Sequence, residues 1–343
     1  MFGRASQELE KYEDSKKVLL LASSVDPDSP VAWQGLAALC DKQADVFTVD
    51  ESITIYTRIK DIVKDDNEKV DTTFRKIASL YLKKEESFNA AKALHELIGQ
   101  LTDGKLITTA WKSIIEVLSP VKNPSEAETK LLQDSLEATL NDSVLGENEK
   151  NYQIYLRLLY SSRQLDRALS AAIAMAAIFP TAYPLEWIAR LYVETTADPK
   201  PGESTFSLEK ETLAEHIKKL LRLNNASPWG NLAQGIIYKK ENKLSEAKAH
   251  LRAGAERLPN QLLGWHLLLG VQMELYEWPS VETSCRRALC IIADIISSNA
   301  GRVPGGEQPQ NYQHKLLLTQ AQALSYMGHE NHLKQAIDIL RKV

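Results

Sequence analysis

The seven histidines are the residues of this 343-residue chain that could hold a metal ion. His95 opens the run HELIG, which lacks the second histidine that the zinc-protease motif HExxH requires. His329 and His332 are spaced to share one helical face, but no cysteine or pair of carboxylates stands near them in the sequence. We therefore expect no metal site and no cofactor.

The three cysteines, Cys40, Cys285 and Cys290, are too few for a disulfide framework and include no CxxC pair. Cys40 and Cys285 stand where the repeat described below places a packed apolar residue, so we expect both to pack in the core. The chain has no GxSxG, GxGxxG or Walker motif, and its carboxylates single out no acid–base pair. These observations predict no catalytic residue, and thus a protein that is not an enzyme.

The charged residues also limit the class of partner. The 41 basic and 45 acidic residues give a formal net charge of −4 and are mixed along the chain. The strongest basic cluster, His216–Arg222, has the spacing of the solvent-facing side of an amphipathic helix. We therefore expect protein partners, with RNA reached only indirectly and no small-molecule substrate.

The start of the chain, MFGRASQELEKYEDSKK, lacks the uninterrupted apolar segment of a signal peptide. No run approaches the ~18 apolar residues that a membrane-spanning helix needs. Unpaired cysteines suit a reducing compartment. We expect a cytoplasmic protein, with the nucleus as a second location and no membrane partner.

A repeated spacing organises the chain and indicates its fold class. Four segments place small or apolar residues at offsets of zero, four and seven, and in three of them a proline follows at offset twelve. These offsets mark one face of a helix that the proline ends. The four sets are Ser15, Leu19, Ala22 and Pro27; Ala168, Ala172, Met175 and Pro180; Ala247, Leu251, Gly254 and Pro259; and Val281, Cys285 and Ala288.

A second pattern begins at three tryptophans and continues with a leucine three residues later. The sets are Trp33, Leu36, Ala37 and Cys40; Trp229, Leu232, Ala233 and Ile236; and Trp265, Leu268, Leu269 and Gln272. Joined to the first pattern, it resembles the tetratricopeptide signature W-x2-L-G-x2-Y…A-x3-F…P. The step from Trp229 to Trp265 is 36 residues, against the usual ~34. We attribute the excess to a longer turn at Lys239–Lys243.

The two patterns predict how neighbouring helices pack. We expect each tryptophan ring to fill the space left by the small residues of the second helix. If the rings of Trp33 and Trp265 are fully buried, replacing either with alanine is expected to cost about 3–5 kcal/mol. The expected packing residues are Trp33, Leu36, Ala22, Pro27, Ala168, Pro180, Trp229, Leu232, Ala247, Gly254, Pro259, Trp265, Leu268 and Ala288.

The predicted fold is all-α, a tetratricopeptide-type α-solenoid of about eight helix pairs with no sheet. Residues 1–194 are the N-terminal helical repeats (degenerate between 41 and 165), 208–296 are tetratricopeptide repeats, and 311–343 are the last helix pair. The stretches 195–207 and 297–310, rich in Pro, Gly and Ser, are predicted loops. An ordinary helical bundle is the alternative, but it does not explain why both spacings recur. The helices expected in the degenerate region are Glu51–Val63, Thr72–Leu82, Ser87–Leu101, Ile107–Leu118 and Glu126–Leu140.

Some tetratricopeptide domains bind a partner's C-terminal carboxylate with Lys, Asn and Arg side chains that face a groove. The corresponding positions, one and two residues after each tryptophan, hold Gln34-Gly35, Gly230-Asn231 and His266-Leu267. Only Asn231 suits that task, so we expect no clamp of this kind.

Three stretches resemble the large scaffold subunit of the superkiller (Ski) complex: Asp26–Lys42 with its WQGLA core, Arg75–Tyr81 (RKIASLY) and Phe179–Glu186 (FPTAYPLE). The resemblance covers nearly the whole chain, but only the N-terminal arm of a scaffold several times longer. It implies a non-catalytic scaffold that assembles an RNA helicase and β-propeller subunits, in a complex that feeds cytoplasmic messenger RNA to the exosome for 3′→5′ decay. It carries over no functional residue, because the matching motifs are packing motifs.

Two other functions fit the patterns: an unrelated tetratricopeptide adaptor that grips a peptide, and the regulatory array of an enzyme, such as a glycosyltransferase, whose catalytic domain lies elsewhere. The chain starts and ends inside helix pairs, as a fragment, an isoform or an incomplete gene model would. We therefore expect self-association or partner binding through the exposed residues Leu19, Leu20, Leu333, Ile337 and Leu340.

Overall fold

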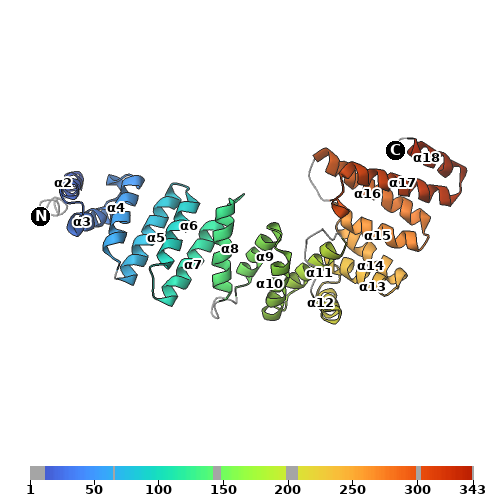
Figure 1. Ribbon diagram of the computed structural model, residues 1–343, viewed down its shortest axis with the longest axis horizontal. Helices are drawn as coiled ribbons and strands as arrows, with labels where there is room; N and C mark the ends of the chain where they lie inside the picture. Colours follow the sequence, from blue (N-terminus) through green and yellow to red (C-terminus); the bar gives the residue numbers. More distant parts are fainter. Residues whose placement is uncertain (1–11, 65, 142–147, 198–207, 299–302, 342–343) are drawn as a thin grey trace. The chain divides into compact units, whose positions relative to one another are not determined.

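The computed structural model describes residues 12–64, 66–141, 148–197, 208–298 and 303–341. These residues form seventeen α-helices and contain no strand (Figure 1). The predicted all-α class and its tetratricopeptide-type solenoid are therefore confirmed. The chain divides into two compact units, residues 1–158 and 159–343, and each is described by itself.

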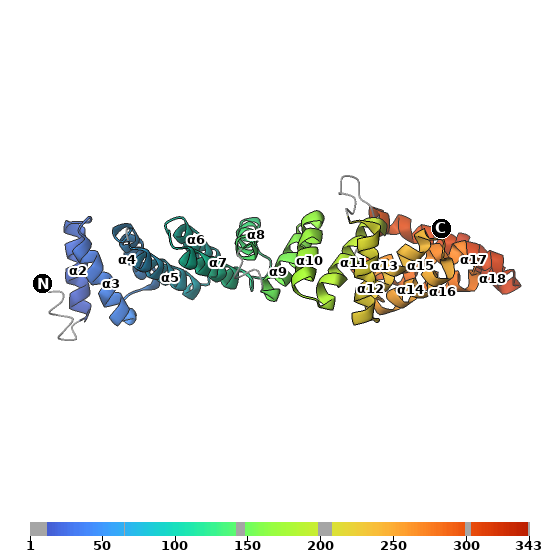
Figure 2. The same cartoon turned by 90° about the horizontal axis from the view of Figure 1, so that it is seen from below.

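In the first unit every helix from α2 to α7 packs on the next helix along the chain, which is how stacked repeats bury their apolar faces. Figure 2 shows these helices following one another in chain order. A short 3-10 helix, η1 (Ala44–Val46), precedes α4. The α-helices are α2 (Tyr12–Val25), α3 (Pro30–Lys42), α4 (Val49–Ile62), α5 (Asn67–Lys83), α6 (Ser87–Ile98), α7 (Gly104–Leu118), α8 (Glu126–Leu140) and α9 (Glu149–Ser161), whose last residues belong to the second unit.

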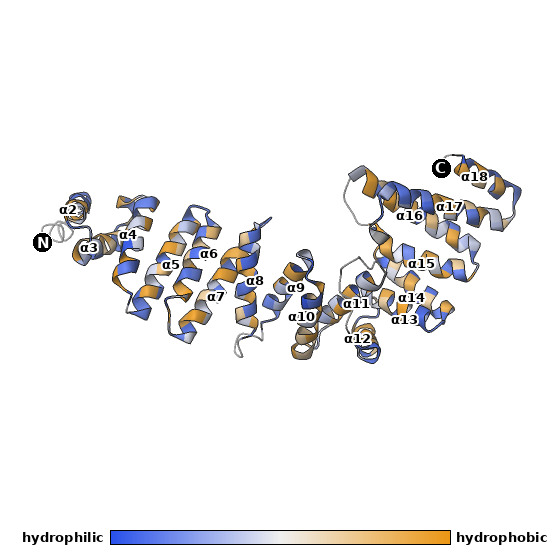
Figure 3. Ribbon diagram, viewed as in Figure 1, coloured by the Kyte–Doolittle hydropathy of each residue, from blue (hydrophilic) through white to orange (hydrophobic). Residues whose placement is uncertain are grey.

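The second unit continues the same arrangement, and α11 also packs on α13, the first helix of the next pair. Polar and apolar residues are interspersed along its helices (Figure 3). The helices are α10 (Leu165–Ile178), α11 (Ala182–Ala197), α12 (Lys210–Leu223), α13 (Pro228–Lys240), α14 (Leu244–Arg257), α15 (Leu262–Glu274), α16 (Trp278–Ser298), α17 (Pro309–Met327) and α18 (Glu330–Leu340), with η2 (Pro304–Gly306) before α17.

Side-chain caps fix where several helices begin. Thr48 and Glu51 form a capping box at the start of α4, and Ser125 and Glu128 form another at the start of α8. Ser227 caps α13 by accepting a hydrogen bond from the backbone N–H of Gly230. Each cap satisfies backbone N–H groups that have no partner inside the helix.

One turn conformation joins the two helices of a pair at four places. The N–H of the left-handed turn residue donates to the carbonyl three residues earlier, and the next N–H donates to the carbonyl five residues earlier. Together these bonds satisfy the carbonyls that the ending helix leaves free. The turn residues, with φ between 58 and 61°, are Glu85, Arg163, Asn242 and Tyr276.

These turns correct the explanation given for the 36-residue step. Asn242 and Tyr276 are 34 residues apart, and the turns after α13 and α15 make equivalent hydrogen bonds. The prediction of a longer turn at Lys239–Lys243 is therefore wrong. Trp229 is the second residue of α13 whereas Trp265 is the fourth of α15, so the tryptophan has moved within its helix.

Counting from the turn also reveals a regular repeat inside the region predicted to be degenerate. Ala247, Leu251 and Gly254 stand five, nine and twelve residues after Asn242. The corresponding residues after Glu85 are Ala90, Leu94 and Leu97, with exposed fractions of 0, 2 and 0%. The sequence reading overlooked this segment because α5 contains no tryptophan and no proline follows α6 at the expected offset.

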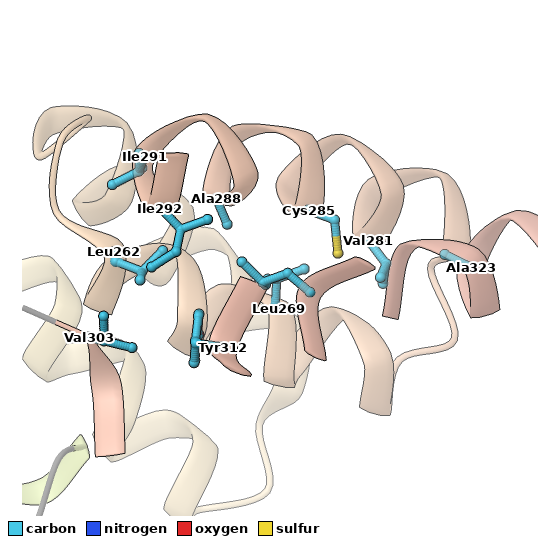
Figure 4. Packing of buried hydrophobic residues seen from close by; sticks show 11 residues of the cluster. Leu262, Leu269, Val281, Cys285, Ala288, Ile291, Ile292, Val303, Tyr312 and Ala323 are labelled. Atoms are coloured by element: carbon cyan, nitrogen blue, oxygen red, sulfur yellow. The ribbon is translucent and has the colours of Figure 1, made fainter. Parts of the chain in front are cut away.

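A continuous apolar core joins α15, α16 and α17 (Figure 4). Because α16 packs on both of its neighbours, its apolar side chains meet those of the helix before and of the helix after. This is the neighbour-to-neighbour burial that a repeat array requires. The buried residues are Leu262, Leu269, Val281, Cys285, Ala288, Ile291, Ile292, Val303, Tyr312, Leu316 and Ala323.

The two predicted loops are shorter than expected. Helix α11 continues to Ala197 and α16 to Ser298, while η2 and the start of α17 occupy part of the second predicted loop. In α11 the Thr195 hydroxyl donates to the Leu191 carbonyl 2.7 Å away, as threonine does inside a helix. Residues 198–207 and 299–302 lie outside the described residues. None of the described helices is long and apolar enough to cross a membrane.

Candidate functional site

The groups that could do chemistry differ in burial, and two of them, Cys290 and His329, are exposed. The rings of His329 and His332 meet edge to face, with centroids 5.2 Å apart. Within the described parts of the chain, no three His, Cys, Asp or Glu side chains gather as a metal ion would need. Cys40 and Cys285 are buried, and burial raises the pKa of the Cys285 thiol to about 12, so that it stays protonated.

The residues predicted to pack the repeats fall into three groups by burial. Trp33 and Trp265 are half-buried, and Ala22 and the three prolines Pro27, Pro180 and Pro259 are exposed. A proline that ends a helix gains nothing from burial, which explains its exposure. The buried members are Leu36, Ala168, Trp229, Leu232, Ala247, Gly254, Leu268 and Ala288.

A leucine side chain, rather than a tryptophan ring, lies against each of two glycines, Gly254 of α14 and Gly35 of α3. A Cβ atom added to Gly254 would lie 2.7 Å from Cγ of Leu232, and one added to Gly35 would lie 2.8 Å from Cδ2 of Leu19. Trp33 instead points its indole N–H at the Pro27 carbonyl, 2.8 Å away. Because the rings of Trp33 and Trp265 are not fully buried, the expected cost of about 3–5 kcal/mol does not apply to them.

Of the five apolar residues expected to be exposed near the two ends of the chain, four are exposed and one is half-buried. Leu19 is half-buried against Gly35, which contradicts the expectation for that residue. Leu20, Leu333, Ile337 and Leu340 are exposed, by 39 to 53%.

Asn231, the one residue suited to a carboxylate clamp, has a structural task instead. Its side chain is 5% exposed, and its amide donates to the backbone carbonyls of Asn225 and Ser227 at 3.0 and 2.8 Å. Its Oδ1 lies 2.9 Å from Nδ1 of His250 on α14. These bonds fix the loop before α13 to the start of that helix and leave no donor for a ligand.

A polar and aromatic cluster in the second unit is the strongest candidate for a binding site. Its centre is the Arg190 guanidinium on α11, which lies 4.3 Å from the ring centroid of Tyr160 and 5.2 Å from those of Trp187 and Trp229. The rings come from three first helices of successive pairs, α9, α11 and α13. A guanidinium over several ring faces is held by cation–π attraction.

Hydrogen bonds fix the orientation of this guanidinium. Arg190 donates from Nε to the Glu194 carboxylate at 3.1 Å and from Nη2 to the Tyr160 hydroxyl oxygen at 2.9 Å. The Tyr160 hydroxyl in turn donates to Glu194, 2.7 and 2.8 Å from its two oxygens. Burial, and then the Glu194 charge, raises the pKa of Tyr160, so it remains a donor at neutral pH.

A pocket of about 250 Å³ opens beside this cluster and is lined by Tyr183, Glu186, Trp187, Arg190 and Trp229. Its walls are two nearly buried indole rings, 9 and 7% exposed, and a half-buried phenol. Oε1 of Glu186 accepts a hydrogen bond from Ser227 at 3.1 Å. Aromatic walls with a few polar groups are features suited to binding a ligand.

Sequence reasoning missed this pocket for an identifiable reason. Phe179–Glu186 was noted only for its family resemblance, and Trp187 was not counted among the repeat tryptophans because Arg190 stands where the pattern requires leucine. The signal that could have found the pocket was this break in the W-x2-L pattern, a charged residue on a helix face that the repeat otherwise keeps apolar.

The fold and its packing define a tetratricopeptide-type repeat protein. No family model matches the chain. It is similar over 79% of its length to a tetratricopeptide repeat protein from Parabacteroides merdae (97% of that chain, TM-score 0.44, 11% identity). It is similar over 73% of its length to PilF of Pseudomonas aeruginosa (99% of that chain, TM-score 0.39, 15% identity).

The resemblance to the superkiller scaffold is confirmed by sequence relatives. The chain is 24% identical over 353 residues to Superkiller complex protein 3 of Homo sapiens, an alignment that covers 99% of this chain and 21% of that protein. It is also 24% identical to Superkiller complex protein 3 of Mus musculus, over 84% of this chain and 18% of the mouse protein. The chain thus spans about a fifth of the length of these relatives.

Proposed function

We propose that this chain is a non-catalytic protein-interaction scaffold of the superkiller complex, which supports exosome-mediated 3′→5′ decay of cytoplasmic messenger RNA. The observation that carries the proposal is the similarity to Superkiller complex protein 3 over 99% of the chain. The partners proposed from the family resemblance are the RNA helicase and the β-propeller subunits of that complex.

The described structure supports a binding role over a catalytic one. Of the reactive groups that sequence analysis considered, the buried cysteines pack in the core and the rings of the histidine pair contact each other. The stacked helix pairs are instead suited to binding, because each pair contributes surface residues to a continuous face. We place the protein in the cytoplasm, with RNA contacted only through its partners.

An affinity capture from cell extract tests the proposal. The whole chain is tagged, recovered under gentle conditions, and examined by mass spectrometry for the helicase and the β-propeller subunit. The matched control is Leu232→Ala, which removes a fully buried side chain from α13 and should disturb the second unit. We expect both subunits with the natural chain and less of them with the control. Recovery of neither subunit with the folded natural chain contradicts the proposal.

An unrelated tetratricopeptide adaptor is the second candidate, and one observation favours it: the aromatic pocket around Arg190 is a binding feature that does not depend on superkiller partners. Capture of peptide-bearing proteins outside that complex, with neither superkiller subunit present, would favour this candidate.

A further inference from the structure

We propose that the pocket lined by Tyr183, Glu186, Trp187, Arg190 and Trp229 binds a proline-rich segment of a partner protein, with a basic residue beside the prolines. The proposal presupposes only that the chain is a protein-binding scaffold. It does not require that the partner belong to the superkiller complex.

The first support is the shape of the pocket and the aromatic side chains that line it. Two indole rings and a phenol face a cavity of about 250 Å³, and the rings of Tyr183 and Trp187 stand edge to face with centroids 6.5 Å apart. Aromatic rings set at an angle form slots in which the flat, rigid pyrrolidine rings of a polyproline helix can lie. Such a segment is already extended before binding, so little conformational entropy is lost.

The second support is the excess of hydrogen-bond donors over acceptors. The indole N–H groups of Trp187 and Trp229, the Tyr183 hydroxyl and Nη1 of Arg190 make no hydrogen bond with any described residue. None of the four is among the buried polar atoms of the described residues that lack a partner. A proline-rich segment presents backbone carbonyls with no internal partner and few N–H groups, which matches a wall of donors.

The third support is the charge around the pocket. Arg190 is already paired with Glu194, and Glu186 has no ion-pair partner among the described residues. These three side chains, one guanidinium and two carboxylates, carry a formal charge of −1. A ligand carboxylate or phosphate would meet this negative charge, whereas an arginine or lysine of the ligand could pair with Glu186.

The test uses the purified whole chain and fluorescence anisotropy of a fluorescein-labelled peptide, about ten residues of proline ending in one arginine. Three probes of matched length serve as comparisons: a Gly/Ser peptide ending in arginine, a proline peptide ending in glutamate, and an oligouridine. We expect saturable binding that is tightest for the proline–arginine peptide. Equal binding of the Gly/Ser peptide, or a preference for the glutamate peptide or for oligouridine, would overturn the proposal.

Two variants locate the binding in the pocket. Tyr183→Ala removes a half-buried wall and should weaken the proline–arginine peptide by about tenfold, the effect expected of an aromatic contact. Glu186→Gln should weaken that peptide by about threefold, and should leave a proline peptide without arginine unchanged. Tyr326→Ala, on an exposed tyrosine of α17 outside the pocket, is the control and should bind like the natural chain.

Circular dichroism checks that each variant is folded. If Tyr183→Ala unfolds, the peptide affinity of Glu186→Gln decides the test. This variant should stay folded, because glutamine keeps the side-chain volume and an oxygen that accepts from the Ser227 hydroxyl. Natural affinity in the folded variants overturns the proposal. Because the probe is a synthetic peptide, its failure leaves the superkiller capture experiment unaffected, and failure of the capture leaves the peptide titration unaffected.

Discussion

Helices α11 and α13 are neighbouring first helices of successive pairs, yet they use the same sequence spacing differently. In α13, Trp229 is followed three residues later by Leu232, which is fully buried against Gly254 of α14. In α11, Trp187 is followed at the same distance by Arg190, a charge that needs Glu194 and Tyr160 to be accommodated. The comparison teaches that a position which packs one repeat can serve a binding surface in the next.

The side chains of Leu232 and Arg190 also differ in how much they stabilise the fold. Apolar burial at Leu232 stabilises the stack through area removed from water and through close packing. At Arg190 much of the favourable interaction is offset by partial desolvation of the charge, and the side chain is 28% exposed. A departure from the local packing rule with no gain in stability is expected at functional positions.

The largest change in the free energy of unfolding is expected at Leu232, the apolar residue of the two compared positions. Leu232→Ala should lower the free energy of unfolding by about 2–5 kcal/mol, because the side chain is fully buried and leaves a cavity beside Gly254. Leu223→Ala, at a leucine that is 53% exposed at the end of α12, should change it by less than about 0.5 kcal/mol. Urea denaturation followed by circular dichroism compares the two. Equal effects would mean that Leu232 does not hold α13 and α14 together.

A smaller change in the free energy of unfolding is expected at Arg190, the charged residue of the two compared positions. Arg190→Met should destabilise by about 1–3 kcal/mol, because it leaves the nearly buried Glu194 carboxylate without its cation. Arg252→Met, whose partner Glu256 is exposed like Arg252 itself, should cost less than about 0.5 kcal/mol. Adding Glu194→Gln to Arg190→Met should restore part of the loss, since no unpaired charge then remains. If the double variant is no more stable than the single one, the ion pair is not the cause.

The smallest effect is a pH dependence that comes from His250. Because the Asn231 amide donates to two backbone carbonyls, its Oδ1 must accept, and Nδ1 of His250 therefore carries the hydrogen between them. Burial lowers the pKa of His250 below its ordinary value of about 6.5. As pH falls, the unfolded chain therefore takes up a proton on His250 before the folded chain does. The stability that neutral His250 contributes is fully present above pH ~6.5 and is lost as pH falls below that value.

Replacement of His250 tests this dependence. His250→Gln should show a smaller drop in urea midpoint between neutral pH and about pH 5.5 than the natural chain shows. Glutamine cannot take up a proton in that range. The same drop in both proteins would assign the pH dependence to other groups.

The sequence patterns predicted the elements better than the contacts between them. Helices such as α8, at Glu126–Leu140, have the predicted bounds because a capping residue and an apolar face mark them locally. The partner of a side chain is not local. Tryptophan rings are expected to fill the space beside the small residues of the second helix, but Leu232 takes that space beside Gly254, because the spacing gives a helix face and not which bulky residue reaches across. The repeat after Glu85 was missed because α5 contains no tryptophan and no proline follows α6 at the expected offset.

The pocket shows a second limit of sequence reasoning. Tyr160 and Trp229 are 69 residues apart, and only the stacking of α9, α11 and α13 brings both rings to Arg190. The missing leucine after Trp187 could be seen in the sequence. The partners that make Arg190 part of a binding surface could not, because they come from three different repeats.

The proposal that this chain holds other proteins can be tested by direct reconstitution. The purified chain is mixed with the purified RNA helicase and β-propeller subunits of a superkiller complex, and the mixture is resolved by size-exclusion chromatography with light scattering. We predict that the chain elutes with both subunits, at a mass that accounts for all of them. A folded chain that elutes alone at every concentration tested would contradict the claim.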